Sequence, residues 1–252
     1  MSTAETDETD ELLERFGRKV RQLVPVEAIW AHGSLALGDF QPRSSDVDLV
    51  VLSAGELDLT QQAELRGMHK KLAKRTELAE RLSCTYVDKT HVADVGRLHP
   101  TWAHGKALGR PLTPVMRREL LAGGLTLYGP EPAGIVPPVS DEELAEFIRS
   151  DLRDFWYPAT DKKGIWQKDV WVDLGPLTVA RAKVTLEDGR LITKGEALDV
   201  MNSLAAPPAL VDDICRRRYE ADLGITRKWR AERGELARKF VRAQIEKVLS
   251  SP

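Results

Sequence analysis

The chain has 252 residues, of which 42% are hydrophobic and 30% are charged, and its formal net charge is −2. This length is enough for one large or two modest domains with hydrophobic cores. The near-neutral balance gives no general attraction to nucleic acid or anionic membrane, and no apolar run reaches the length of a membrane span. The acidic N-terminus lacks a signal-peptide pattern, and two cysteines, Cys84 and Cys215, give no disulfide framework, so we expect a cytoplasmic protein.

Helical and strand patterns alternate in the first half of the chain. Residues 1–8 are polar and acidic, which predicts a frayed tail, and apolar residues at helical spacing predict an amphipathic helix over residues 10–24. The other expected elements are strands at 26–31, 49–52, 83–87 and 125–128 and helices at 60–82 and 114–122. The return from helix to strand predicts a mixed sheet with helices packed against it.

Two short motifs lie at the ends of the first two predicted strands. Gly33-Ser34 follows the first strand and opens a short helix, whose free N–H groups suit a phosphate. Asp46 and Asp48 lead into the second strand, where residues two apart share a face. A carboxylate pair is suited to a hard divalent cation such as Mg²⁺. The alternative is a pair of solvated carboxylates, but the Gly-Ser motif upstream favours phosphoryl or nucleotidyl transfer.

A change in composition divides the chain. Residues 129–138 contain four prolines and two glycines, which predicts an extended, semi-rigid crossing. We therefore expect an α/β (α+β) domain with a mixed sheet over residues 1–130, a linker at 129–139 and an all-α helical bundle over 140–252, with a ligand cleft between the domains. The helices expected in the bundle are 141–157, capped by Ser140, then 173–186, 194–204, 208–223 and 227–249.

Gly-Ser followed at this distance by Asp-x-Asp resembles the polymerase-β-type nucleotidyltransferase superfamily. The rest of the chain is similar to the aminoglycoside (streptomycin/spectinomycin) adenylyltransferases. The resemblance implies an ATP- and Mg²⁺-dependent enzyme that adenylates an aminoglycoside hydroxyl. It gives Asp46 and Asp48 the role of catalytic metal ligands and gives Gly33 and Ser34 the role of nucleotide contacts.

A basic pair in the second domain strengthens this resemblance. The family has an Arg at the end of a Leu-Thr-x-x-Arg run and a Lys thirteen residues later, and both contact nucleotide phosphates. Arg181 and Lys194 have that setting and spacing here. An Arg fork and a mobile Lys charge suit triphosphate oxygens, and Lys194 at a helix start opposes the helix dipole, as expected of a residue placed for a ligand. The alternative is two ordinary surface cations.

Trp156 and Asp161 match the family's antibiotic-binding Trp and Asp, five residues apart. With Asp169 and Asp173, Asp161 is expected to form an acidic wall that attracts a polycationic aminoglycoside. The alternative for Trp156 is a core packing residue. The segment between Trp156 and Arg181 is longer than in the streptomycin enzymes, which leaves the acceptor open.

One family residue is missing. The family places a glutamate, the general base for the acceptor hydroxyl, at the start of the strand after the long helix, and Ser83 occupies that position. Asp88 or Glu80 is a possible substitute, although Asp88 has the opposite strand parity. General base catalysis typically contributes about 100- to 10,000-fold, so the sequence allows a slow enzyme.

Four hypotheses follow from the sequence. The first is an aminoglycoside adenylyltransferase, the second is the same chemistry on another small-molecule acceptor, and the third is a nucleotide-binding relative without activity. The fourth is nucleic-acid binding by the basic C-terminal helix. It is disfavoured because the apolar stripe of that helix indicates a packed helix with a solvated basic face. His91, His99 and His104 lack metal-ligand spacing and are expected to be loop residues. A monomer and a homodimer are both allowed.

Overall fold

The computed structural model describes residues 3–220 and 224–250. The chain divides into two compact units, Met1–Val139 and Ser140–Pro252. The segment 129–139 belongs to the first unit, and the division falls at its end.

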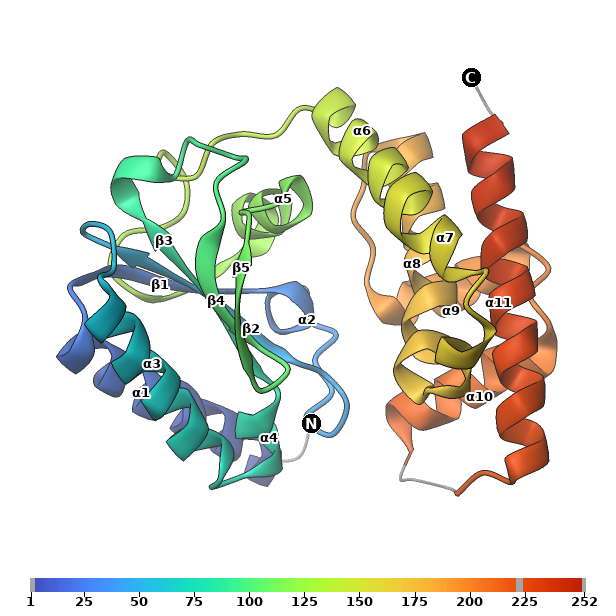
Figure 1. The fold of residues 1–252 in the computed structure, drawn as a ribbon, viewed down its shortest axis with the longest axis horizontal. Helices are drawn as coiled ribbons and strands as arrows, with labels where there is room; N and C mark the ends of the chain where they lie inside the picture. Colours follow the sequence, from blue (N-terminus) through green and yellow to red (C-terminus); the bar gives the residue numbers. More distant parts are fainter. Residues whose placement is uncertain (1–2, 221–223, 251–252) are drawn as a thin grey trace. The chain divides into compact units, whose positions relative to one another are not determined.

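The first unit is built on a six-stranded mixed sheet with the strand order β5-β4-β3-β2-β1-β6 (Figure 1). The strands are β1 (Val26–His32), β2 (Val47–Ser53), β3 (Leu82–Asp88), β4 (His99–Ala103), β5 (Lys106–Arg110) and β6 (Leu125–Tyr128). Strands β2 and β3 are parallel, and the other neighbouring pairs are antiparallel. The parallel pair follows from the helical crossover between β2 and β3, because parallel neighbours cannot be joined by a tight turn.

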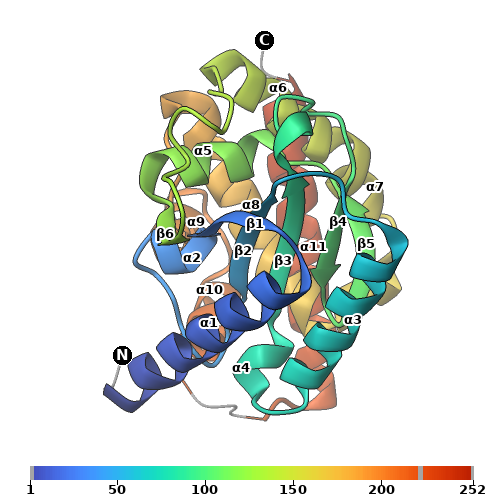
Figure 2. The same cartoon turned by 90° about the vertical axis from the view of Figure 1, so that its left-hand side faces the viewer.

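Helices cover both faces of this sheet (Figures 1 and 2). They are α1 (Thr3–Leu23), α2 (Gly33–Ala36), α3 (Leu59–Ala73), α4 (Glu77–Glu80), the 3₁₀ helix η1 (Lys89–His91) and α5 (Pro114–Gly123). Buried side chains of α1 and α3 pack on one face of the sheet, and those of α5 pack on the other. The predicted fold of this part, a mixed sheet with helices against it, is confirmed.

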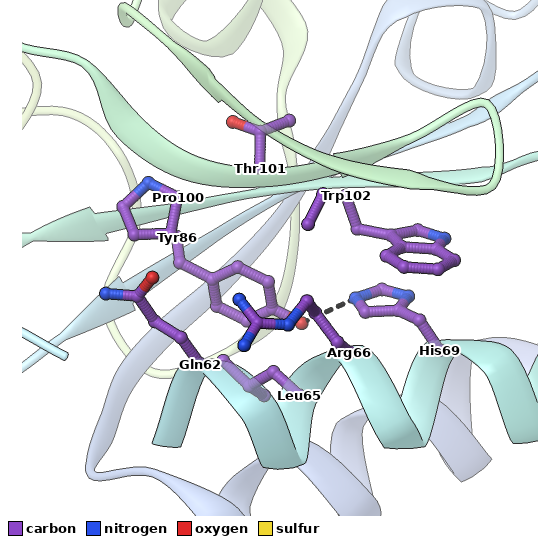
Figure 3. A pocket seen from close by; sticks show the side chains of 9 residues that line it. Gln62, Leu65, Arg66, His69, Tyr86, Pro100, Thr101 and Trp102 are labelled. Atoms are coloured by element: carbon purple, nitrogen blue, oxygen red, sulfur yellow. Dashed lines mark hydrogen bonds between the residues drawn. The ribbon is translucent and has the colours of Figure 1, made fainter. Parts of the chain in front are cut away.

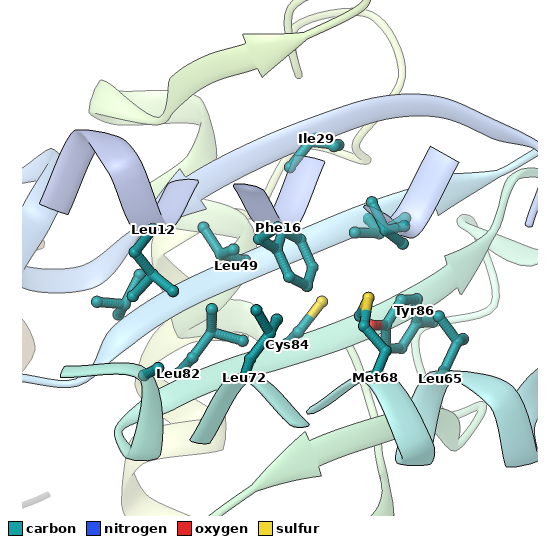
Figure 4. Packing of buried hydrophobic residues seen from close by; sticks show 14 of the residues in the cluster. Leu12, Phe16, Ile29, Leu49, Leu65, Met68, Leu72, Leu82, Cys84 and Tyr86 are labelled. Carbon is teal, nitrogen blue, oxygen red and sulfur yellow. The ribbon is translucent and has the colours of Figure 1, made fainter. Parts of the chain in front are cut away.

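The larger core lies between the sheet and the two long helices. Phe16 of α1, Leu72 of α3 and Cys84 of β3 meet there, each almost fully buried (Figure 4). Burying one such side chain contributes about 1.5–3 kcal/mol. Every second residue of β3 therefore points into this core. The residues between them, Ser83 and Thr85, lie on the other face of the sheet, which α5 covers.

Three sequence predictions differ from the observed elements. Residues 3–8 are helical rather than a frayed tail, because α1 begins at Thr3. The predicted helix over 60–82 is wrong beyond Ala73, because the Thr76 side chain accepts a bond from the Ala79 N–H and starts α4. His99 and His104 were expected in a loop but lie in the β4–β5 hairpin, with positive φ angles of 52° at His104 and 71° at Gly105.

The second unit is all helical. Its elements are α6 (Asp141–Asp151), the π-helical turn η2 (Leu152–Trp156), α7 (Tyr157–Ala159), the 3₁₀ helix η3 (Lys163–Gln167), α8 (Asp169–Asp188), α9 (Lys194–Ser203), α10 (Pro208–Tyr219) and α11 (Arg227–Ser250). Helices α8 and α11 pack together with η3. A Cβ on Gly175 of α8 would lie 2.9 Å from the Trp166 ring and 3.2 Å from Val241 of α11, so glycine permits this close packing.

The predicted all-α second domain is confirmed, and Ser140 caps α6 by accepting a bond from the Glu143 N–H. The predicted helix over 208–223 is observed to Tyr219, and residues 221–223 lie outside the described residues. Within the described part of the chain, no helix combines the length and apolar character that crossing a membrane requires.

A buried histidine lies between α3 and the sheet. The His69 ring stacks on Trp102 with a centroid distance of 5.1 Å, and its Nε2 lies 2.7 Å from the Tyr86 hydroxyl (Figure 3). Burial lowers the pKa of His69 from 6.5 to about 3. The folded protein therefore holds this ring neutral at pH values where the unfolded chain protonates it.

This difference predicts an acid-sensitive first unit. As pH falls from 6.5 towards 3, the unfolded state gains a proton that the folded state excludes, so His69 lowers the free energy of unfolding by up to about 1.4 kcal/mol per pH unit. Urea denaturation at pH 7, 6 and 5 should show a smaller pH dependence in His69→Gln, which keeps a partner for Tyr86 without titrating. His104→Asn, at an exposed turn, serves as the matched control. An unchanged pH dependence in His69→Gln would contradict this role.

Candidate functional site

The Gly-Ser motif lies where β1 ends and α2 begins. Gly33 has a φ of +64°, and a Cβ built on it would lie 2.8 Å from Oδ2 of Asp48. Both the backbone conformation and the closeness of this carboxylate require glycine at position 33. Ser34, the next residue, is half-buried. The structure therefore brings Gly33 and Asp48 together, as the sequence predicts.

The second carboxylate lies directly before β2. Val47 is fully buried in the core, whereas Asp46 and Asp48 on either side of it are half-buried. The loop before Asp46 is held by Arg81, whose guanidinium donates to the carbonyl oxygens of Ser45, at 3.1 Å, and of Pro42. Alternation at the strand end thus directs both carboxylates away from the core that holds Val47.

A row of three side chains crosses the sheet at this point. Asp48 is paired in register with His32 of β1 on one side and with Ser83 of β3 on the other. Residues directly opposite in neighbouring strands share a face. Ser83 therefore stands beside Asp48, at the place where the family's glutamate was expected.

Asp88 cannot replace that glutamate. It pairs with Ser53 at the other end of β2, five residues along the strand from the Asp48–Ser83 pair, which is roughly 16 Å. Its carboxylate also accepts bonds from the backbone N–H and hydroxyl of Thr90, both at 2.9 Å, and lies 2.8 Å from His91. Burial raises the pKa of Asp88, but these bonds outweigh burial, and the pKa is lowered.

Glu80, the other possible base, is the last residue of α4 and is exposed. Ser83 lies three residues further on, within β3.

A buried His–Glu pair adjoins the carboxylates and was missed by sequence reasoning. Nδ1 of His32 lies 2.9 Å from Oε2 of Glu119 on α5, and both side chains are less than 10% exposed. Burial lowers the pKa of His32, but the bond to Glu119 and the negative charges of Asp48 and Glu119 outweigh burial and raise it. No motif in the sequence marks Glu119. His32 could have been recognised as a candidate, because it directly precedes Gly33 of the Gly-Ser motif.

The basic pair lies in the second unit and is joined by a loop. Nε of Arg181 on α8 donates to the carbonyl oxygen of Ile192 at 2.9 Å. Thr193 then caps α9, of which Lys194 is the first residue, through a capping box with Glu196. The structure therefore brings Arg181 close to the chain segment that carries Lys194, and both side chains are half-buried.

The remaining predicted contacts both interact with other side chains of the second unit. Trp156 is 8% exposed and packs edge-to-face on Phe155 and Trp171, with centroid distances of 5.4 and 5.6 Å. Asp161 is exposed and accepts a bond of 2.6 Å from Arg242 of α11. Trp156 thus belongs largely to the core, and Asp161 is part of an ion pair.

The prediction of an acidic wall that attracts polycations is wrong for Asp169 and Asp173, because arginines compensate their charges. Asp169 pairs with Arg217, Arg230 and Arg233, and Asp173 pairs with Arg217. The sequence showed the carboxylates on one segment, but their cationic partners come from α10 and α11. Only the packing of these helices reveals that the charges are compensated.

Comparison with known protein families gives a match within the first unit. Residues 13–86 match the family model described as "Nucleotidyltransferase domain". This part of the chain is therefore similar to nucleotidyltransferase domains. The match extends from α1 to β3, and so contains Gly33, Asp46, Asp48 and Ser83.

The whole chain shares its fold with a solved structure of spectinomycin adenyltransferase AAD(9) from Enterococcus faecialis, determined with ATP and spectinomycin. The TM-score is 0.71 at 15% sequence identity, over 94% of this chain and 98% of that one. A search of curated protein sequences found no match. The chain therefore has the fold of that adenyltransferase.

The donor set fits one divalent cation that is shared with a substrate. Among residues 3–220 and 224–250 there is no cluster of three or more His, Cys, Asp or Glu side chains suited to a metal. Mg²⁺, however, is commonly held by one or two carboxylates together with substrate phosphates and water. Asp46 and Asp48 supply such a pair, and Gly33 leaves the space beside Asp48 free of a side chain.

The His32–Glu119 pair gives a direct prediction. Removing the charge of Glu119 in Glu119→Gln should lower the pKa of His32, because burial, the largest influence, is then opposed mainly by Asp48. NMR titration of the imidazole measures the pKa, and the spectrum of His32→Gln assigns the signal among five histidines. Glu131→Gln, at an exposed carboxylate, is the control. A pKa that stays the same or rises in Glu119→Gln would contradict the stated cause.

Proposed function

We propose that this protein is a Mg²⁺-dependent adenylyltransferase that transfers AMP from ATP to a hydroxyl group of an aminoglycoside. The observation that carries the proposal is the Asp48 carboxylate against the backbone of Gly33, with Asp46 two residues earlier, inside a nucleotidyltransferase domain. The fold shared with a spectinomycin adenyltransferase supports the choice of ATP and of an aminoglycoside acceptor.

In this proposal Asp46 and Asp48 would hold the metal ion, which neutralises phosphate charge when it is bound. The backbone N–H groups at Gly33 and Ser34 bind phosphate oxygens at the start of α2. Arg181 and Lys194 are the proposed phosphate contacts of the second unit, the first as a planar fork and the second as a point charge. The Arg181 guanidinium is oriented by its Nε bond to the carbonyl oxygen of Ile192.

The reaction exchanges one bond at phosphorus for another. The acceptor hydroxyl oxygen bonds to the α-phosphorus of ATP while the bond from that phosphorus to pyrophosphate breaks, with the two oxygens in line. The hydroxyl proton must leave in this step. Ser83 lies where a carboxylate would accept the proton, so we expect the proton to pass to solvent and the transfer to be slow.

Trp156 and Asp161 are the proposed antibiotic contacts. For Asp161 to bind an ammonium group, its ion pair with Arg242 must open or be shared. Because Asp169 and Asp173 are already paired with arginines, the proposed site attracts polycations less than the sequence suggested. This observation favours a second candidate, the same transfer to a different small-molecule hydroxyl.

The serine at position 83 favours a third candidate, a nucleotide-binding relative with impaired catalysis. It pairs with Asp48, and Asp88 is remote and bonded to Thr90 and His91. The three candidates share the nucleotide site and differ in the acceptor and the rate.

Incubation with each nucleoside triphosphate, Mg²⁺ and a panel of aminoglycosides, read by mass spectrometry, tests the proposal. We expect an adenylated aminoglycoside with ATP, and loss of product in Asp48→Asn, which removes a metal-ligand charge. Asp94→Asn, an exposed residue outside the site, should keep wild-type activity. ATP binding without transfer to any aminoglycoside would reject the first candidate, and Mg²⁺-ATP affinity unaffected by Asp48→Asn would reject the metal site itself.

Position 83 offers a gain-of-function prediction. Ser83→Glu places a carboxylate beside Asp48 and should raise the rate of transfer by about 100- to 10,000-fold if a general base is what the enzyme lacks. Single-turnover rates at saturating Mg²⁺-ATP measure the effect. Ser83→Gln matches the size of the new side chain without its basicity, and equal rates for the two variants would refute the prediction.

A further inference from the structure

An open groove runs between α1 and β6 in the first unit. Its volume is about 670 Å³. The α1 side presents Asp10, Leu13, Glu14, Gly17, Arg18 and Arg21. Leu127 and Tyr128 border it from the other side, at the edge of the sheet where β6 lies (Figure 2). We refer to these residues as the α1–β6 groove.

The strand that borders the groove is an exposed edge. All four residues of β6 are exposed, and Leu125, Leu127 and Tyr128 are 44%, 38% and 39% accessible. Exposed apolar side chains on an edge strand invite association with another chain, and natural proteins usually blunt such edges. The groove therefore offers an apolar surface that a partner can cover.

The charges along α1 identify that partner. On the α1 side of the groove, the N-terminal half is acidic because of Asp10 and Glu14. The C-terminal half is basic because of Arg18 and Arg21. Glu11 and Arg15 on the same helix form an i,i+4 ion pair. Glu14 and Arg18 have the same spacing, yet within the described part of the chain neither they nor Asp10 take part in an ion pair or a side-chain hydrogen bond.

We propose that the α1–β6 groove is the interface of a two-fold homodimer in which the two copies of α1 pack antiparallel. In this arrangement Glu14 of each copy faces Arg18 of the other, and Asp10 faces Arg21, so the surface is complementary to itself. A two-fold interface requires this reciprocity, because residue i contacts j and j contacts i. A parallel arrangement would place like charges together.

The residue near the two-fold axis suits a close approach. Gly17 lies between the facing charges, and a Cβ at this position would contact only Ile29 of its own chain, at 3.6 Å. The missing side chain keeps the groove open above Ile29, which also lines it. Leu13, Leu127 and Tyr128 then supply the apolar contacts around the helices, and Tyr128 is already covered on one side by Arg21, at 4.5 Å.

Charge reversal on the full chain tests this interface. Sedimentation equilibrium should show a concentration-dependent dimer for the wild type. Glu14→Arg and Arg18→Glu should each raise the dimer dissociation constant by about tenfold or more, because each places two like-charge pairs across the axis. An equimolar mixture of the two variants should form a heterodimer of wild-type affinity, and the double variant Glu14→Arg/Arg18→Glu should dimerise again.

Lys19→Glu changes the charge of α1 by the same amount outside the groove, and should leave the dimer intact. Circular dichroism of every variant checks that α1 still folds. A wild-type protein that remains monomeric at high concentration would overturn the proposal. A dimer insensitive to Glu14→Arg, or single variants that dissociate without recovery in the mixture, would overturn it equally.

Discussion

The carboxylate of Asp48 lies against the Cα of Gly33, and much of the candidate site depends on this contact. The antiparallel register of β1 and β2 places His32 opposite Asp48, so the chain must turn out of the sheet at position 33, beside the carboxylate. A positive φ and the lack of a side chain make that turn possible. Glu119 of α5 then holds His32 and adds another acidic group beside the carboxylate pair.

The parallel register of β2 and β3 decides which residue can assist the acceptor. Ser83 stands beside Asp48, whereas Asp88 stands beside Ser53. Strand alternation puts Asp88 on the face of the sheet opposite to Ser83. On that face, Cys84 and Tyr86 pack towards α1 and α3. Asp88 is close to Ser83 in sequence, but its distance from Asp48 and the face it occupies exclude it as the general base.

The second unit is held together by arginines as well as by apolar packing. Arg233 is fully buried and bonds to Asp213 at 2.7 Å and to Asp169. Removing one partner from a buried ion pair typically costs about 3–5 kcal/mol, because a charge remains without compensation. These carboxylates are therefore committed to the fold, which leaves Arg181, Lys194 and the Asp161–Arg242 pair as the charged groups of this unit that the proposed function uses.

The sequence alone determined the elements with strong periodicity and the motifs whose residues are close along the chain. It predicted the strands around Gly33 and Asp48, the helical second unit and the mixed sheet, because these follow from local patterns of apolar residues, caps and glycines. It also predicted that Asp88 has the opposite strand parity to Ser83, because strand parity can be read from the order of residues alone.

Only the tertiary structure decided which charges compensate each other. The partners of Asp169 lie 48 to 64 residues away, at Arg217, Arg230 and Arg233, and Glu119 is 87 residues from His32. Such pairs depend on the packing of helices and on the register of strands, and neither leaves a pattern in the local sequence. The β4–β5 hairpin was missed for a related reason, because its His-Gly turn and short strands carry a weak local signal and are fixed by pairing with β3.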